Sequence, residues 1–211
     1  LDDNVLESAL AHSEAGVRRH ALRLAEERLN SRKNLLNAAL RLASDPSPVV
    51  RLQLALSLGE SDAPHSLKTL ADLARRHGEE AWLDGAILSS LGNRAGKMLK
   101  IMLSNKTDTL GQARGLIHRL CSAVASRKNP EEFSDVISLL SELDNPDLQL
   151  ECLKGLRAPF KSATTLTISD APREALIQLA TTSNVEVRGA ALELTRVLNL
   201  ESTAERTERL A

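Results

Sequence analysis

A short motif recurs along the chain, and its spacing constrains the fold more than any other feature of the sequence. Val-Arg followed by an Ala/Leu-rich run occurs in GVRRHALRLAE (16–26), VVRLQLALSLGE (49–60) and EVRGAALELTRVL (186–198). Arg18 and Arg51 stand 33 residues apart. A period of about 20–50 residues is typical of arrays in which each unit buries its apolar face against its neighbours. The chain is therefore expected to repeat one structural unit.

The composition indicates that this unit is helical. Apolar residues make up 42% of the 211 residues, but the aromatic ones are Phe133, Phe160 and Trp82 alone, and there is no Tyr. The core must therefore consist of Leu, Ala, Val and Ile, and Leu and Ala, which dominate, are good helix formers. Few stretches alternate apolar and polar residues as strands do. The predicted fold class is all-α.

Polar turns divide the sequence into about six helix pairs, which predict an α-α superhelix, or solenoid, in one domain over residues 1–211. Residues 158–172, APFKSATTLTISDAP, have Pro near both ends and β-formers between, so we expect a long surface loop. Residues 201–211 are expected to be a tail or a truncated repeat. The expected pairs are 3–29, 31–58, 64–91, 95–126, 131–157 and 171–198.

Arg51 is the one charge in a helix that is apolar on nearly every side. A helical projection places it on the apolar face, while Gln53 and Ser57 form the polar stripe. A buried guanidinium must be paired and hydrogen-bonded, and turn groups such as Asp45, with carbonyls of the neighbouring repeat, are the candidate partners. Contact with a ligand is the alternative.

The position of Arg51 recurs in the other repeats. Asp84 takes this place in the third repeat and interrupts the series, and Gln149 takes it in the fifth. We therefore predict a structural ladder of arginines at the turns. Its members are Arg18, Arg51, Arg114 and Arg188.

The pattern xP-x-VR-xxA/L-xxxLG resembles HEAT repeats, and the likeness covers nearly the whole chain. The resemblance implies a protein that binds other macromolecules through a curved surface. VRRHALRLAEERL, DPSPVVRLQLALSLGE and WLDGAILSSLG more narrowly resemble the HEAT segment of planctomycete-type membrane-bound dehydrogenases. Those proteins join a sugar-dehydrogenase-like propeller, HEAT repeats and a c-type cytochrome domain.

This narrower resemblance carries over no catalytic residue. The chain has no CxxCH, so it attaches no haem itself, and it has too few strands for a propeller. The resemblance implies a spacer or docking module, a fragment of an exported redox protein whose parent chain could be an oxidoreductase. The chain begins at Leu1 without a signal-peptide pattern, as expected of a fragment. The expected location is exported or periplasmic if the likeness holds, and cytoplasmic otherwise.

No motif in the sequence predicts an enzyme. The five histidines form no HExxH, which also argues against the metal-dependent HEAT hydroxylases, and no P-loop, GxGxxG or GxSxG occurs. We predict no catalytic, cofactor-binding or metal-binding residue and no cofactor. Cys121 and Cys152 lie in apolar helical patterns, so buried thiols are favoured over a disulfide. No apolar run approaches the roughly 20 residues of a membrane span.

Trp82 and Asp84 raise one enzymatic alternative. Some HEAT-fold DNA glycosylases use Trp and Asp on a concave face, but they surround lesions with several aromatics, and this chain has one Trp. The favoured interpretation is that Trp82 covers a helix start and that Asp84 caps or pairs locally.

Charge is uneven along the chain, although the net charge is only −1. Residues 94–128 carry eight Lys and Arg against one Asp, a net +7, and residues 130–161 carry three against seven acidic residues, a net −4. Solvated faces of opposite sign, a docking patch and a nucleic-acid surface are the alternatives. The favoured function is a non-catalytic interaction or spacer module that binds a protein or neighbouring domains of its own chain. The alternative is a nucleic-acid-binding or DNA-repair protein with a basic face. The possible partner-binding residues are Lys97, Lys100, Arg114, His118, Arg119 and Trp82.

Overall fold

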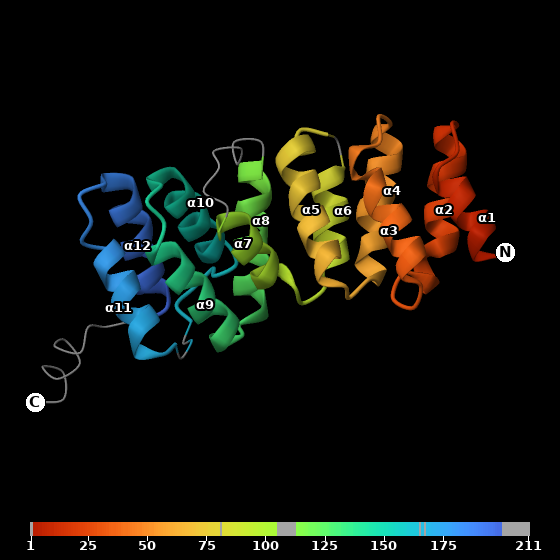
Figure 1. Ribbon diagram of the computed structural model, residues 1–211. Coiled ribbons are helices and arrows are strands. Elements are labelled where there is room, and N and C mark those ends of the chain that lie inside the picture. Colours follow the sequence, from red (N-terminus) through yellow and green to blue (C-terminus); the bar gives the residue numbers. More distant parts are fainter. Residues whose placement is uncertain (1, 81, 105–112, 165, 167, 200–211) are drawn as a thin grey trace, which may run out of the picture. The chain divides into compact units, whose positions relative to one another are not determined.

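The computed structural model describes residues 2–80, 82–104, 113–164, 166 and 168–199. These residues form twelve α-helices, with three short 3-10 helices and no strand among them (Figure 1). The prediction of an all-α fold with about six helix pairs is confirmed. Residues 105–112 of the expected fourth pair (95–126) and the expected tail at 201–211 lie outside the described residues. The helices are α1 (Asp3–Leu10), α2 (Ala15–Ala25), α3 (Lys33–Arg41), α4 (Pro48–Ser57), α5 (Pro64–His77), α6 (Leu83–Leu91), α7 (Ala95–Ser104), α8 (Arg114–Arg127), α9 (Pro130–Ser141), α10 (Pro146–Arg157), α11 (Asp170–Leu179) and α12 (Val185–Val197).

Local signals in the sequence account for where these helices begin. Four of them, α4, α5, α9 and α10, have Pro as their first residue, where the missing N–H costs no hydrogen bond. Asn129, Asn145 and Asn184 precede α9, α10 and α12, and each side-chain oxygen accepts a backbone N–H of the first turn. The turns are therefore specified by residues within a few positions of each helix.

The described residues divide into two compact units. The first unit holds α1 to α6 and the first three residues of α8, and the second holds α7, the rest of α8 and α9 to α12. A single solenoid over 1–211 stays a prediction. No helix among the described residues is long and apolar enough to cross a membrane.

In the first unit, the second helices of the three pairs form one layer, in which α2 packs on α4 and α4 packs on α6. We call the surface of this layer the second-helix face. The first helices begin a parallel layer, in which α1 packs on α3. Leu22, Leu54 and Ile87 of the second-helix layer are fully buried, as the repeated apolar pattern requires.

The second unit repeats this arrangement, with α9 packed on α11 and α10 packed on α12. Helices α8 and α10 approach closely where Gly155 faces the His118 carbonyl, since a Cβ on Gly155 would lie 2.4 Å from that oxygen. Cys121 and Cys152 are buried free thiols on these two helices. Burial raises the pKa of the Cys121 thiol well above its usual value, and a hydrogen bond with Cys152 acts in the same direction.

The segment between α10 and α11 is held to the core of the second unit, contrary to the expectation of a surface loop. Its apolar side chains Phe160, Leu166 and Ile168 are at most 6% exposed. The Phe160 ring packs edge-on against Phe133, with 6.4 Å between ring centroids. These side chains are buried because they cover apolar surface that the helices leave open.

Candidate interaction surfaces

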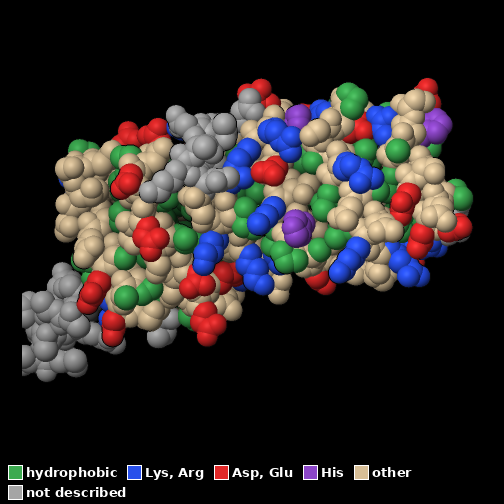
Figure 2. All heavy atoms as spheres, in the orientation of Figure 1, with side chains coloured by type: hydrophobic (Ala, Val, Ile, Leu, Met, Phe, Trp, Pro, Cys, Tyr) green, Lys and Arg blue, Asp and Glu red, His purple; other side chains and the backbone are tan. Residues whose placement is uncertain are grey.

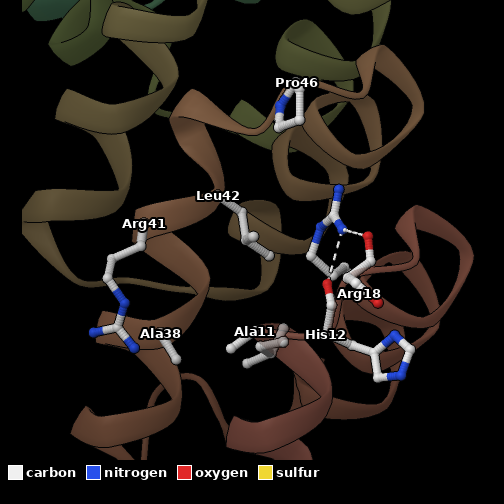
Figure 3. Close-up of a pocket in the computed structure, with 9 residues that line it drawn as sticks. Ala11, His12, Arg18, Ala38, Arg41, Leu42 and Pro46 are labelled. Carbon is white, nitrogen blue, oxygen red and sulfur yellow. Dashed lines mark hydrogen bonds between the residues drawn. The ribbon is translucent and has the colours of Figure 1, made fainter.

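Arg18 joins the first helix pair to the second. Its Nε and Nη2 donate to the two carboxylate oxygens of Asp45, at 2.6 and 2.8 Å. Its Nη1 donates to the carbonyls of His12 and Ser13, at 2.8 and 2.7 Å, so the side chain lies against its own turn (Figure 3). The guanidinium thus closes one turn and binds the carboxylate of the next.

Asp45 is the acidic partner in this contact, and 3% of its side chain is exposed. Burial acts to raise its pKa, but the hydrogen bonds from Arg18 and the Ser47 amide, with the charges of Arg18 and Arg51, outweigh burial and hold the pKa below its usual value. The carboxylate is therefore ionised wherever the protein is folded at neutral pH.

Arg51 repeats the arrangement one pair further along. Its Nη1 donates to the Asp45 carbonyl, and its Nε and Nη2 donate to Glu80 in the turn before α6. Glu80 also pairs with His77 Nδ1 at 3.0 Å. Asp45, the partner that the sequence suggested, thus binds Arg51 through its carbonyl, while its carboxylate binds Arg18.

The other positions of the predicted ladder differ among themselves. Arg188 is half-buried and donates to the Thr182 carbonyl at 2.8 Å. Gln149 donates to the Leu143 carbonyl at 2.8 Å, which is again the carbonyl six residues earlier. Arg114 is exposed. The residue type at this position therefore varies, while the bond that closes the turn recurs at Arg18, Arg51, Gln149 and Arg188.

A small pocket lies beside the Arg18 turn, between the first two helix pairs (Figure 3). Its volume is about 350 Å³, and its lining includes Leu10, His12, Ala38 and Leu42. Arg18 is committed to Asp45 and to the turn carbonyls, so the pocket offers a ligand little free polar chemistry. We interpret this pocket as a shallow depression between the packed helices.

A larger hollow, of about 720 Å³, opens on the second-helix face at the carboxyl ends of α2, α4 and α6. Glu26 lies in it and accepts hydrogen bonds from Gln53 Nε2 at 3.1 Å and Ser57 Oγ at 2.7 Å. Gln53 and Ser57 thus bind Glu26 across the helices instead of forming a solvent-facing stripe, and Ser57 is fully buried. Leu56 also lines the hollow and is 42% exposed.

Three large apolar side chains are exposed on α4 and at the start of α6, and we call them the apolar stripe. Val49 and Leu56 are two helical turns apart on α4 and are 48% and 42% exposed. Trp82, 33 residues after Val49, is 82% exposed and has φ of 71°, a left-handed conformation that is rare for a bulky residue. The prediction that Trp82 covers a helix start is therefore wrong, because this backbone conformation presents the ring to solvent.

The predicted partner-binding residues are divided between the two units. Lys97, Lys100 and Arg119 are exposed in the second unit, where His118 is half-buried with its Nδ1 3.7 Å from Glu151. Trp82 and Arg114 belong to the first unit. The set therefore does not form one described surface.

Basic side chains also gather where the sequence analysis did not place them. The first helices α3 and α5 present exposed Lys and Arg along one face of the first unit (Figure 2). Arg76 is partly committed there, since its Nη1 donates to Ser44 Oγ at 3.1 Å. These residues are Arg32, Lys33, Arg41, Lys68 and Arg76. In the part of the chain that the structure describes, no group of three His, Cys, Asp or Glu side chains could hold a metal ion.

The family model for HEAT repeats matches residues 4–92, which extend from α1 to α6. This part of the chain is therefore similar to HEAT repeats. No curated protein matches the sequence.

Engineered repeat proteins are among the similar solved structures. An engineered protein from the Northeast Structural Genomics Consortium has a TM-score of 0.46 at 15% identity, over 95% of this chain and 100% of that one. A designed armadillo repeat protein has a TM-score of 0.40 at 11% identity, over 92% and 98%. Another designed armadillo repeat protein, in complex with the peptide (KR)4, has a TM-score of 0.36 at 15% identity, over 92% and 80%.

Proposed function

We propose that this chain is a non-catalytic protein-interaction module that binds a partner protein through the second-helix face of its first unit. The observation that carries the proposal is the exposure of the apolar stripe, Val49, Leu56 and Trp82, of which Leu56 also lines the hollow. Exposed apolar patches on a folded protein mark interaction sites, because water contact with them is unfavourable. HEAT repeats over residues 4–92 fit a surface of this kind.

The chemistry of the stripe favours a partner protein. Tryptophan is enriched among the residues that contribute most to protein interfaces, since it buries a large apolar area with few rotatable bonds. The hollow is lined by Glu26, Glu60 and Asp62 and also by Arg23 and Arg94, so its charge is mixed. A partner segment with apolar side chains and polar groups of both signs would complement both features.

A site-specific crosslink tests the proposal. A photoreactive benzoylphenylalanine replaces Leu56 on the second-helix face, and a matched control replaces the exposed Lys68 on α5. We expect a discrete crosslinked protein from Leu56 and none from Lys68. Crosslinks of equal yield from the two positions, or none from Leu56, would contradict the proposed face.

The identified partner then permits an affinity measurement. Trp82→Ala should weaken binding by about 30-fold, the equivalent of roughly 2 kcal/mol for a central aromatic contact. Lys68→Ala should leave the affinity unchanged. An affinity that Trp82→Ala does not alter would place the interface elsewhere.

A spacer role in an exported redox protein is the finer form of this proposal, and it rests on the dehydrogenase-like resemblance alone. The parent reading frame tests it. An upstream propeller or a downstream CxxCH would support the spacer role, and a complete short gene with its own start codon would contradict it.

Nucleic-acid binding is the second candidate, and the exposed basic side chains favour it. Lys97, Lys100 and Arg119 are exposed in the second unit, and α3 and α5 present a further basic group in the first. Base stacking, worth about 1–3 kcal/mol per base, needs aromatic platforms, and the sequence offers one Trp and two Phe. We therefore expect phosphate contacts alone, with DNA binding that is weak at 50 mM salt and lost at about 200 mM. Anisotropy of labelled DNA measures this, and submicromolar binding at 200 mM salt would favour the nucleic-acid function.

A further inference from the structure

Arg188 occupies the same place in its helix pair as Arg18 and Arg51. In all three residues, Nη1 donates to the carbonyl six residues earlier, which belongs to His12, Asp45 or Thr182. The guanidinium of Arg188 is therefore held in the same orientation relative to its own turn.

The opposite edge of the guanidinium distinguishes Arg188 from the other two. Nε and Nη2 of Arg18 bind Asp45, 27 residues later, and the same atoms of Arg51 bind Glu80, 29 residues later. Both carboxylates lie in the turn of the following helix pair. Within the described part of the chain, Arg188 makes the Thr182 bond alone. Nε and Nη2, which bind a carboxylate in Arg18 and in Arg51, therefore bind no carboxylate in Arg188 among the described residues.

The apolar side chain one helical turn after Arg188, Leu192, is exposed where its counterparts in the other pairs are buried. Leu22, four residues after Arg18, and Ala55, four residues after Arg51, are fully buried, with α4 packed on α2 and α6 packed on α4. Leu192, four residues after Arg188, is 46% exposed. One helical turn separates Arg188 from Leu192, so both lie on one face of α12. This face of α12 thus combines an unpaired guanidinium edge with an exposed leucine.

We propose that this face of α12 is a docking site for a further helix pair of the HEAT type that carries a carboxylate in its turn. The carboxylate would bind Nε and Nη2 of Arg188 in a fork, and the second helix of the incoming pair would cover Leu192. This site lies in the second unit, and it is independent of the proposed second-helix face in the first.

A second copy of the chain does not supply the required group. The residue equivalent to Asp45 in the first helix pair is His12, 33 residues earlier. The two residues share a local role, since His12 Nδ1 accepts the Glu14 N–H and Asp45 Oδ1 accepts the Ser47 N–H. Histidine offers no carboxylate to a guanidinium, so the chain should not stack on itself through α12.

The test extends the chain with a helix pair of its own sequence. Replacement of residues 200–211 by a copy of residues 30–60 places the copied Asp45 27 residues after Arg188, which is the Arg18–Asp45 spacing. Leu192→Cys in both the extended and the original chain reports coverage through its alkylation rate, because Cys121 and Cys152 are fully buried. We expect the extension to slow alkylation at least about tenfold, as for a pair docked nine-tenths of the time. The protection should be lost with Arg188→Ala or with Asn in place of the copied Asp45.

Two results would overturn the proposal. Equal alkylation rates in the extended and original chains would show that the face accepts no such pair. Full protection that survives both substitutions would show that the guanidinium edge plays no part in recognition.

A variant of the 211-residue chain decides the question if the extended chain fails to fold. His12→Asp gives the first pair a turn carboxylate, so light scattering should show association that increases with concentration and that Arg188→Ala abolishes. The unaltered chain should stay monomeric. Self-association of the unaltered chain that Leu192→Asp abolishes, or no association of the His12→Asp chain, would contradict the proposal.

Discussion

Arg51→Ala is the substitution that most directly probes how neighbouring helix pairs are held together. The side chain is 10% exposed, and it joins the turn of its own pair to the turn of the next. Removal of the guanidinium leaves the Asp45 carbonyl and the Glu80 carboxylate without this donor. The two groups differ in how well water can replace it.

The size of the effect follows from this difference. The bond to the Asp45 carbonyl is buried, and loss of a partner at a buried acceptor costs about 1–3 kcal/mol. The Glu80 side chain is 22% exposed and keeps its contact with His77. Loss of its ion pair with Arg51 should therefore cost about 0–1 kcal/mol of stability, as for a partly solvated ion pair. We expect Arg51→Ala to lower the free energy of unfolding by about 2–3 kcal/mol. For a chain of this length, the midpoint should fall by roughly 4–12 °C.

Thermal unfolding followed by circular dichroism measures the shift, and hydrogen exchange locates it. Exchange should accelerate first at the turns before α4 and α6. The matched control is Lys68→Ala, an exposed change in the same unit, which should stay within about 0.5 kcal/mol. If the two variants unfold at the same midpoint, Arg51 contributes no more than a surface charge, and the ladder interpretation fails.

Three further predictions concern single groups. Folding lowers the pKa of Asp45, so the ionised carboxylate stabilises the fold at pH values above its unfolded pKa. This stabilisation is lost as the pH falls through the lower folded pKa. Urea unfolding should therefore show that the wild type loses its stability advantage over Asp45→Asn below about pH 4. Gly155→Ala should cost about 1–3 kcal/mol because its Cβ would meet the His118 carbonyl, whereas Gly189→Ala, with nothing within 4 Å, should be neutral or stabilising by thermal melting. Cys121 should react with a thiol reagent only at the rate of unfolding, since it is fully buried, and fast labelling of the native protein would show that α8 opens.

The helices could be predicted because their signals are local. Proline at the first turn of α4 and asparagine before α10 act within three residues of the helix start, so no distant contact is needed to read them. The same holds for the turn-closing bond, whose donor and acceptor are six residues apart. The 33-residue recurrence then shows that these local units are stacked.

The contacts between pairs could not be predicted with the same certainty. A helical projection gives each side chain a direction but not a neighbour. It placed Gln53 and Ser57 on a polar stripe, but it did not show that they bind Glu26 across the helices. Trp82 was misplaced because its left-handed backbone conformation has no signature in the residues around it.

The sequence by itself thus determined the all-helical class, the repeat and the turns, because interactions within about six residues specify them. Only the tertiary structure decided which carboxylate each arginine binds, with Asp45 bound to Arg18 and Glu80 bound to Arg51. It also decided which apolar side chains are exposed and where α12 presents an uncovered face. The physical reason is that these contacts join residues 27–35 positions apart, so they depend on the register in which one helix pair packs on the next.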